Sequence, residues 1–435
     1  RKREVIMTDV RHLAFIVGKR RAFARSNAIY SKASYQEMLT VTLEGLVDRF
    51  NLHNACIGEV AGGAVMKHSK DFNLVRESVL STSLAPETPA FDLQQACGTG
   101  LEACILVANK IALSQIESGI ACGVDTTSDA PIAINEKMRR ILLQVNGAKS
   151  TGQRLSILSK LRPSMLFKPV LPRNGEPRTG LSMGEHAELM AREWQISREK
   201  QDQFTLSSHK KLLQAYDQGL FNDLMTAFYG CSRDNNLRDD LSIEKLRNLK
   251  PCFDKKVAPN QGTLTPGNST TLTDGASSVL LASEKWAQEK DLPILAYLTF
   301  SEVAAVDFYD KKEGLLMAPA YAVPRMLDRA GLTLQDFDYY EIHEAFAAQV
   351  LCTLKAWEDK SFCKDRLGLR QPLGRIDQSK LNVNGSSLAT GHPFAATGAR
   401  IVATLAKVLA QKGSGRGLIS ICAAGGQGVV AIIES

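Results

Sequence analysis

The hydrophobic positions along the chain predict short strands that alternate with amphipathic helices. Residues 13–17 form a short apolar run typical of a strand, and residues 35–51 repeat apolar side chains at helical spacing. A strand, a helix and a second strand are predicted further along, at 91–96, 101–118 and 120–124. This alternation predicts an α/β protein.

The C-terminal region repeats this order. Residues 380–384 lead into a Gly/Ser-rich loop, residues 396–411 predict a helix, and strands follow at 417–422 and 429–433. Because strand, small-residue loop, helix and strand recur, we expect a duplicated α/β unit whose two small-residue loops face each other. A reactive centre would then lie where the two halves meet.

A more charged and irregular stretch separates the two halves. It covers residues 128–258, which we interpret as a helical domain inserted into the first half. The first half therefore consists of residues 1–127 and a return strand within 259–290, and the second half of residues 291–435. The expected architecture is two layered α/β halves with an inserted helical loop domain.

Composition limits the class of protein. With 435 residues, 44% of them hydrophobic and 23% charged, the chain is long enough for two or three globular domains. Its apolar runs are far shorter than the roughly 20 residues that cross a bilayer, so we expect neither a transmembrane helix nor a secretory signal. The chain begins with Arg1, and what precedes that residue is left open.

Nine cysteines are present without Cys-x-x-Cys spacing or a paired pattern. This usage indicates a reducing compartment and argues against a structural zinc site. We expect most of the nine to be buried small apolar side chains.

Positive charge is concentrated in residues 137–173, although the net charge of +7 is modest for this length. The segment has no acidic residue and nine basic ones: Lys137, Arg139, Arg140, Lys149, Arg154, Lys160, Arg162, Lys168 and Arg173. Apolar residues recur in it at i, i+3, i+4 and i+7: Met138, Ile141, Leu142 and Val145. A basic amphipathic helix of this kind docks on an anionic membrane surface or a partner subunit, or else packs on its own domain. We expect no nucleic-acid partner.

Two cysteines and a histidine lie on small-residue loops. Cys97 follows a predicted strand and opens a predicted helix, so backbone N–H groups and the helix dipole would favour its thiolate. His392 stands between Gly391 and Pro393, where it can deprotonate a thiol near neutral pH. Cys422 stands at the start of a Gly/Ala-rich loop. Taken singly, each has a plainer explanation as a buried cysteine or a histidine that caps a loop.

A second histidine, His343, follows the apolar and aromatic run 337–340. It is either part of the same site or a core histidine that ends a strand. The other histidines have no comparable setting and are expected to be structural or solvated: His12, His53, His68, His186 and His209.

Together these loops resemble those of the thiolase family. The motifs are Cys97-Gly-Thr-Gly100, Asn268-Ser269 to Asp274-Gly275, His343-Glu-Ala-Phe346, Gly391-His392-Pro393 and Cys422-Ala-Ala-Gly-Gly426. They occur in the family's order and at its distances, so the resemblance covers essentially the whole chain. Most members carry Asn in place of His343. The His-Glu-Ala-Phe form with the basic segment is similar to the β subunit of the fatty-acid oxidation trifunctional complex and its bacterial relatives.

The resemblance implies a thiolase fold, with layers ordered α-β-α-β-α, and acetyl-CoA C-acyltransferase activity in fatty-acid β-oxidation. Cys97 would attack the 3-oxo carbon of a 3-oxoacyl-CoA after His392 takes its proton, and Cys422 would supply and remove protons. Two oxyanion holes are implied, one from His392 with His343 and the other from the N–H groups of Cys97 and Ala424.

The same resemblance implies that coenzyme A is a substrate and that no metal or other cofactor takes part. The CoA-binding positions that carry over are Ser269, Met183, Met317 and Phe346, although the methionines would equally suit a core and Ser269 a turn. A homodimer or higher oligomer is implied, as is a partner α subunit with hydratase and dehydrogenase activities. The compartment would be the cytoplasm of a bacterium or the mitochondrial matrix of a eukaryote.

Three rival functions stay open. They are an acetoacetyl-CoA thiolase working in the biosynthetic direction, another condensing enzyme on the same fold, and a non-catalytic CoA- or lipid-binding scaffold subunit. The second cysteine, Cys422, weighs against a decarboxylating condensing enzyme. The complete set of two cysteines and two histidines weighs against a scaffold. Chain-length preference and physiological direction cannot be read from the sequence.

Overall fold

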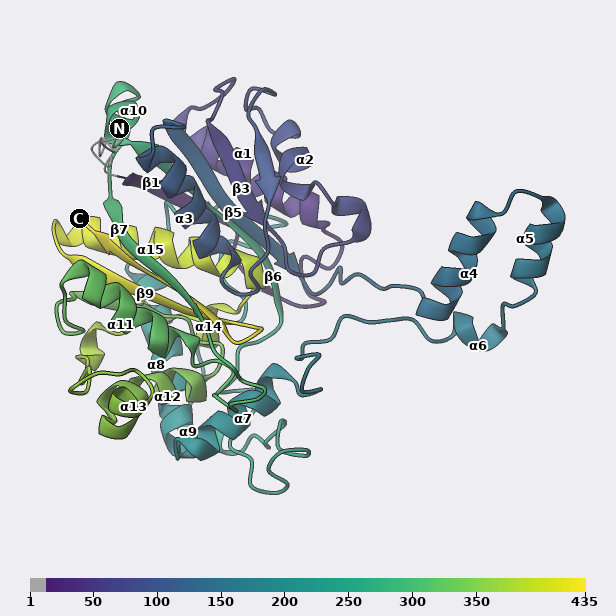
Figure 1. The fold of residues 1–435 in the computed structure, drawn as a ribbon. Coiled ribbons are helices and arrows are strands. Elements are labelled where there is room, and N and C mark those ends of the chain that lie inside the picture. Colours follow the sequence, from purple (N-terminus) through teal and green to yellow (C-terminus); the bar gives the residue numbers. More distant parts are fainter. Residues whose placement is uncertain (1–12) are drawn as a thin grey trace, which may run out of the picture.

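The computed structural model describes residues 13–435. The predicted role of His12 therefore falls outside the described residues. Within them, the strands form one continuous mixed sheet with helices packed on it (Figure 1). Each helix in this range is too short or too polar to span a bilayer.

The elements have the following bounds. The strands are β1 (Leu13–Arg20), β2 (Ala24–Arg25), β3 (Glu59–Gly63), β4 (Ala90–Asp92), β5 (Ser118–Thr126), β6 (Thr273–Ser283), β7 (Ala296–Ala305), β8 (Tyr339–Ile342), β9 (Arg416–Ala423) and β10 (Gln427–Glu434). The helices are α1 (Tyr35–Phe50), α2 (Leu74–Leu80), α3 (Thr99–Ala112), α4 (Glu136–Gly147), α5 (Thr151–Leu158), α6 (Pro163–Leu166), α7 (Met183–Glu193), α8 (Arg198–Asp217), α9 (Ile243–Arg247), α10 (Glu284–Glu289), α11 (Ala318–Ala330), α12 (Ala347–Glu358), α13 (Lys360–Asp365), α14 (Ser387–Thr390) and α15 (Thr397–Lys412). Short 3₁₀ helices are η1 (Ser69–Asp71), η2 (Gln378–Lys380) and η3 (Phe394–Ala396).

The strand order shows an internal repeat. It is β4-β3-β5-β6-β1 in the N-terminal half and, in reverse, β7-β10-β9-β8 in the C-terminal half, with β2 paired to β6. In each half a parallel pair, β3 with β5 or β8 with β9, is followed by antiparallel pairs. β1 and β7 join the halves through the pairs Ala14↔Tyr297 and Phe15↔Ala296. The duplicated α/β unit that the sequence predicts is therefore confirmed.

Helices cover the outer faces and fill the centre. α1 and α2 lie on the N-terminal strands, α11 lies on the C-terminal strands, and α3 and α15 lie between the halves (Figure 1). The core around the two central helices includes Leu101, Val107, Ile401 and Leu405, all of them buried. The layers thus follow the expected order α-β-α-β-α.

Two glycines let the central helices meet at their N-terminal ends. A methyl group on Gly100 of α3 would lie 2.9 Å from the backbone nitrogen of Ala399, and one on Gly398 of α15 would lie 2.9 Å from the Cα atom of Gly100. Side-chain carbons do not tolerate such distances to a backbone, so only glycine fits both positions. The loops that precede the two helices are thereby drawn together.

The predicted boundaries differ most from the structure around the first loop, and β1 also extends three residues beyond the predicted 13–17. β4 ends at Asp92 rather than at Ala96, because the chain turns before Cys97. α3 ends at Ala112 rather than at 118, because Ser114 has a left-handed φ of 59° that no α-helix accommodates. The predictions for α15, β9 and β10 agree with their observed bounds to within two residues.

The region predicted as an insertion contains two differently placed parts. α4, α5 and α6 project from the body on two extended connections (Figure 1), and we call residues 131–173 the arm. α7 and α8 instead pack against α12 of the C-terminal half. The limits 128 and 258 of an inserted domain stay a prediction.

Candidate active site

Three loops meet between the halves, and the first carries Cys97. This residue lies in the turn between β4 and α3, directly after Ala96, which has a left-handed φ of 47°. The hydroxyl of Thr99 holds the turn by donating to the Ala96 carbonyl at 2.7 Å and accepting from the N–H of Gln95 at 2.9 Å. Such a conformation persists only where surrounding contacts impose it. The turn therefore fixes the position of Cys97, a residue that is partly exposed although its sulfur is largely desolvated.

His392 lies on the second loop, next to Cys97. Its Nε2 atom is 3.1 Å from the Cys97 sulfur, and its Nδ1 atom is 2.5 Å from the Thr397 hydroxyl. Its backbone N–H donates to the Thr273 hydroxyl at 2.8 Å, which anchors the loop to β6. Burial, followed by the charge of Arg400, lowers the pKa of His392 to about 3. The imidazole is therefore neutral at pH 7 and can accept the thiol proton.

The thiol of Cys97 differs from the sequence-based expectation. Burial raises its pKa to about 12, and the backbone N–H of Ala424 opposes this shift only in part. α3 begins at Thr99 with Gly98 as its N-cap, so Cys97 precedes the helix. The prediction that a helix start favours the thiolate is wrong, because desolvation outweighs the nearby N–H groups. Proton transfer to His392 is needed to make the nucleophile.

The third loop begins near the end of β9 with Cys422. This side chain is only 1% exposed, and burial, followed by the neighbouring Cys97, raises the pKa of Cys422 well above its usual value. The loop is held by Glu176, whose carboxylate accepts a hydrogen bond from the Gly425 N–H at 2.6 Å. A protonated thiol beside Cys97 can act as an acid.

His343 follows β8 and is fully buried beside His392, with the two ring centres 4.2 Å apart. Its Nδ1 atom lies 2.8 Å from the Ser387 hydroxyl, which also accepts a hydrogen bond from the Arg400 guanidinium at 3.0 Å. A guanidinium can only donate, so the Ser387 proton is free to point at Nδ1. This arrangement places the ring proton of His343 on Nε2.

The Nε2 atom of His343 has no hydrogen-bond partner among residues 13–435. Burial, followed by His392 and Arg400, lowers the pKa of His343 well below its usual value, so the ring is neutral. Leaving a buried N–H without an acceptor costs about 1–3 kcal/mol. A substrate oxygen or a water molecule that accepts from this N–H would remove the cost.

The residues predicted to hold CoA are linked to one apolar cluster. Met317 and Phe346 belong to this large cluster, which also includes Cys422, and Met183 packs against it. Ser269 pairs with Phe346 through the backbone, and its buried hydroxyl has no partner in the described part of the chain. One hydroxyl beside the cluster is therefore available to a ligand.

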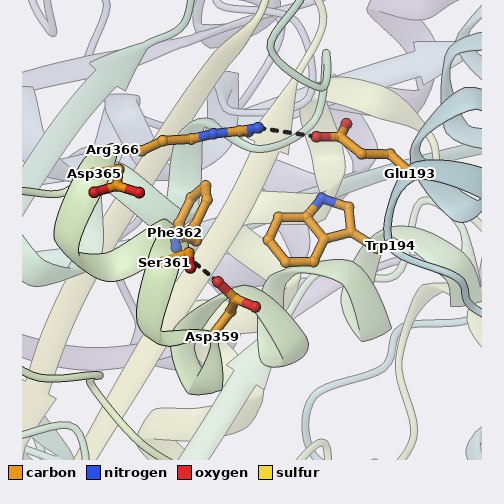
Figure 2. Close-up of a pocket in the computed structure, with 7 residues that line it drawn as sticks. All are labelled: Glu193, Trp194, Asp359, Ser361, Phe362, Asp365 and Arg366. Carbon is orange, nitrogen blue, oxygen red and sulfur yellow. Dashed lines mark hydrogen bonds and ion pairs between the residues drawn. The ribbon is translucent and has the colours of Figure 1, made fainter.

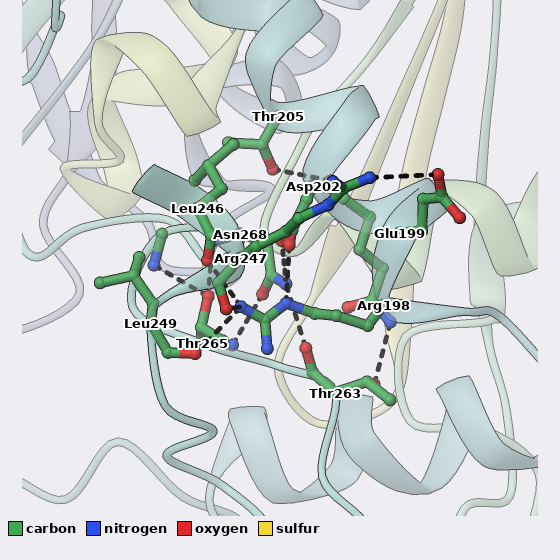
Figure 3. A network of polar contacts seen from close by, with 12 residues as sticks. Arg198, Glu199, Asp202, Thr205, Leu246, Arg247, Leu249, Thr263, Thr265 and Asn268 are labelled. Atoms are coloured by element: carbon green, nitrogen blue, oxygen red, sulfur yellow. Dashed lines mark hydrogen bonds and ion pairs between the residues drawn. The ribbon is translucent and has the colours of Figure 1, made fainter. Parts of the chain in front are cut away.

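A polar network next to Ser269 fixes its loop (Figure 3). The carboxylate of Asp202 on α8 accepts from Arg198 at 2.7 Å and from the amide of Asn268 at 3.1 Å. Asn268 in turn accepts from the N–H of Thr265 at 2.8 Å. Because charge-assisted hydrogen bonds of this kind are strong, α8 holds the residue that precedes Ser269 in place.

Comparison with protein families agrees with this geometry. The family described as "Thiolase, N-terminal domain" matches residues 14–285, and the one described as "Thiolase, C-terminal domain" matches residues 292–435. The chain belongs to the thiolase family. The family, the fold and the acyltransferase class that the motifs predict are therefore confirmed.

Similar proteins include bacterial and human thiolases. A 3-ketoacyl-CoA thiolase of Yersinia enterocolitica is 39% identical over 428 residues, which covers 97% of this chain and 96% of that one. A 3-ketoacyl-CoA thiolase of Escherichia fergusonii is 38% identical, with 97% of each chain covered. Among solved structures, the Bacillus anthracis acetyl-CoA acetyltransferase matches with a TM-score of 0.80 at 28% identity, covering 98% of this chain and 100% of that one. Human mitochondrial 3-ketoacyl-CoA thiolase in complex with CoA matches with a TM-score of 0.78 at 27% identity, covering 99% of each chain.

The sequence did not reveal the residues that position the two imidazoles of this thiolase. Thr397 and Arg400 lie on the first turn of α15, shortly after His392. Their i, i+3 spacing places them on one helix face, and this spacing could have indicated that both side chains point toward the His392 loop. Ser387, 13 residues before Arg400, begins the short helix α14, where no periodic pattern indicates its contact.

A separate pocket of about 260 Å³ lies between α7 and α13 (Figure 2). An ion pair between Arg366 and Glu193, with atoms 3.2 Å apart, crosses one side, and the rings of Trp194 and Phe362 form another. None of the predicted site residues lines this pocket. It therefore lies apart from the chemistry at Cys97.

Proposed function

We propose that this thiolase cleaves a 3-oxoacyl-CoA with CoA, giving acetyl-CoA and an acyl-CoA shortened by two carbons, through an acyl group carried on Cys97. The observation that carries the proposal is the 3.1 Å contact between the Cys97 sulfur and Nε2 of a neutral His392. A buried thiol with a raised pKa needs such a base to become a nucleophile. The relatives named 3-ketoacyl-CoA thiolase support the same substrate class.

The first half-reaction acylates the enzyme. Nε2 of His392 takes the thiol proton, and the Cys97 sulfur adds to the 3-oxo carbon of the substrate. The resulting tetrahedral oxyanion collapses and breaks the bond between carbons 2 and 3. The carbanion of acetyl-CoA that leaves takes its proton from Cys422, whose raised pKa keeps that proton available.

The second half-reaction releases the shortened acyl group. The Cys422 thiolate left by the first step removes the proton from an incoming CoA thiol, which restores Cys422. The CoA sulfur adds to the thioester carbonyl, and Cys97 leaves as a thiolate. The imidazolium of His392 returns its proton to Cys97, so the enzyme ends in its starting state.

Two developing oxyanions need hydrogen-bond donors. One would lie between the N–H groups of Cys97 and Ala424, since the Ala424 N–H faces the Cys97 sulfur. The other would accept from Nε2 of His343, together with His392, directly or through a water molecule. The lack of a partner for that buried nitrogen supports the assignment.

Coenzyme A takes part as a substrate in this scheme. Its pantetheine arm would run along Met183, Met317 and Phe346, whose apolar cluster reaches Cys422. The hydroxyl of Ser269 would bond a polar group of that arm, because it is buried and otherwise unpaired in the described chain.

We also propose that the arm docks on an anionic membrane surface. Half of the exposed large apolar side chains in the described residues belong to it: Ile132, Ile134, Leu142, Leu143, Leu155, Leu158, Phe167, Val170 and Leu171. Its single acidic residue, Glu136, is paired with Arg139 and Arg140. Exposed apolar side chains among basic ones suit the boundary between lipid headgroups and acyl chains. A partner α subunit is the alternative occupant; this subunit, the oligomeric state and the compartment stay predictions.

An assay of the purified protein with a length series of 3-oxoacyl-CoA thioesters tests the activity. We expect CoA-dependent formation of acetyl-CoA and shortened acyl-CoA in equal amounts. Cys97→Ala should abolish it, whereas Cys56→Ala, which removes an exposed cysteine, should retain it. The proposal is wrong if no chain length is cleaved or if Cys97→Ala keeps full turnover.

A further inference from the structure

The catalytic side chains also form a set of metal ligands. The sulfur of Cys97 and a ring nitrogen from each of His343 and His392 lie within 4.8 Å of one another. The Nδ1 atoms of both rings are engaged by hydroxyls, those of Ser387 at 2.8 Å and Thr397 at 2.5 Å. Metal-binding histidines are commonly held in this way, with one nitrogen hydrogen-bonded and the other directed at the ion.

We propose that Cys97, His343 and His392 form a reversible inhibitory binding site for Zn²⁺. Cys and His are the ligands that zinc prefers, and three protein ligands with an open fourth position are typical of zinc sites that exchange a ligand. Tetrahedral ligands bound at roughly 2.0–2.3 Å lie about 3.5 Å from one another. The Cys97 and His392 atoms are 3.1 Å apart and would separate slightly, whereas the ring nitrogen of His343, within 4.8 Å of both, would move closer.

His343 is the residue that distinguishes this site from a simple Cys–His pair. Its Nε2 atom is buried and lacks a hydrogen-bond partner among the residues that the structure describes. A metal ion would bind that nitrogen once the ring proton moves from Nε2 to Nδ1, where the Ser387 hydroxyl can accept it. The fourth position would face the partly exposed side of Cys97 and would hold water or a thiolate ligand.

Zinc and substrate would compete for one sulfur atom. Binding replaces the S–H bond of Cys97 with an S–Zn bond and releases the thiol proton to water, without a change in oxidation state. An acyl group on Cys97 prevents this bond, and bound zinc prevents acylation. The ion is therefore an inhibitor rather than a cofactor, and its binding does not depend on which thioester the enzyme cleaves.

Charges around the cluster limit the affinity. The guanidinium of Arg400 is close enough to lower the pKa of both imidazoles, so it also repels a dication. Asp125 is close enough to raise the pKa of Cys97, so the Asp125 carboxylate attracts a dication. Because the repulsion by Arg400 opposes binding, we expect a weaker affinity than that of a structural zinc site.

A second group of ligands provides a matched control. Glu44, Asp48 and His53 also lie within 4.8 Å of one another, but at the surface. The carboxylate of Glu44 accepts hydrogen bonds from the N–H and the hydroxyl of Ser83, and Nδ1 of His53 lies 2.9 Å from that hydroxyl. His53→Asn removes an imidazole from this group and leaves the catalytic loops unchanged.

Competition for Zn²⁺ between the full-length protein and a chromogenic chelator tests the proposal. We expect one ion per chain for the wild type and for His53→Asn, and binding weaker by about tenfold or more for His343→Asn. Zn²⁺ should also protect Cys97 of the wild type from iodoacetamide. Co²⁺ used in place of Zn²⁺ should give the charge-transfer absorption of a cobalt–thiolate bond.

Equal Zn²⁺ affinity in the wild type and His343→Asn would overturn the proposal. So would loss of binding in His53→Asn, or full alkylation of Cys97 in the presence of saturating Zn²⁺. Thiolysis measured in buffer that contains a chelator is independent of these outcomes. A failure of the zinc proposal and a failure of the proposed activity are therefore distinguishable.

Discussion

At the scale of single residues, burial decides the resting state of the site. It raises the pKa of Cys97 to about 12 and lowers that of His392 to about 3, so both groups are neutral over most of the pH range between these values. The thiolate is then a minor species that forms by proton transfer over the 3.1 Å contact. A resting site of this kind is reactive toward a bound substrate and poorly reactive toward solutes in water.

Alkylation of Cys97 should therefore be slow and nearly independent of pH around neutrality. Transfer of the thiol proton to His392 neither takes up nor releases a proton, so the fraction of the thiolate–imidazolium pair is constant between the two pKa values. Inactivation by iodoacetamide, followed by residual thiolysis and peptide mapping, should change little from pH 6 to pH 9. A rate that rises about tenfold per pH unit would show that hydroxide rather than His392 removes the thiol proton, and would contradict the proposed role of His392.

Cys422 should be separable from Cys97 in a half-reaction. Only the carbanion of acetyl-CoA and the CoA thiol exchange protons with Cys422 in the proposed scheme. Cys422→Ser should still accept an acyl group from acyl-CoA onto Cys97 but lose complete thiolysis by roughly 10²- to 10⁴-fold. The buried Cys104→Ser is the matched control and should retain both reactions. Near-normal turnover of Cys422→Ser would refute the role.

The sequence was sufficient to predict which residues with reactive groups come together, because each stands in a short motif. It was insufficient to predict their protonation. The raised pKa of Cys97 depends on burial by segments distant in the chain, and the tautomer of His343 depends on the contact between Ser387 and Arg400. Neither effect leaves a local pattern in the sequence.

At the scale of secondary-structure elements, the approach of α3 and α15 brings the Cys97 and His392 loops together. Periodicity was sufficient to predict both helices, since their apolar faces are long and regular. It failed for the end of β4, where the left-handed Ala96 and the Thr99 hydrogen bonds set the turn. Such a turn depends on tertiary contacts rather than on side-chain periodicity.

Gly398→Ala tests this approach. The added methyl group would meet the backbone of Gly100, so the two helices must separate. We expect a loss of about 1–3 kcal/mol in the free energy of unfolding, measured with urea, and a larger proportional loss of thiolysis. Gly152→Ala on α5 has open space around it and should be neutral or slightly stabilising. Wild-type stability and activity in Gly398→Ala would contradict the packing argument.

At the scale of the whole molecule, the arm stands apart from the catalytic body (Figure 1). The sequence was sufficient to predict a basic amphipathic segment there. It did not indicate that the helices project from the body. A periodic pattern predicts a helix, but it does not say whether that helix packs against the rest of the protein. Only Ile141 among the arm's apolar residues with described side chains is buried, with 9% of its surface exposed.

Charge reversal tests the docking role of the arm. Changing Arg139, Arg140, Arg154 and Lys160 to Glu should abolish flotation with anionic liposomes at physiological salt, because the apolar residues alone bind weakly. Thiolysis of a short soluble substrate should be unchanged. The matched control reverses four exposed lysines elsewhere: Lys32, Lys70, Lys360 and Lys364.

If flotation survives reversal in the arm, or is lost equally in the control, the membrane proposal is wrong. Loss of co-purification with a protein subunit, with flotation intact, would assign the arm to that partner instead.

Catalysis in the proposed scheme depends on an acyl group carried by Cys97. The most direct measurement is mass spectrometry of the intact protein and its peptides after brief incubation with a 3-oxoacyl-CoA in the absence of free CoA, followed by acid quenching. We predict one shortened acyl group per chain, located on the peptide that contains Cys97 and removed by added CoA with formation of acyl-CoA. An acyl group on another cysteine, or thiolysis without any acylated intermediate, would contradict the account.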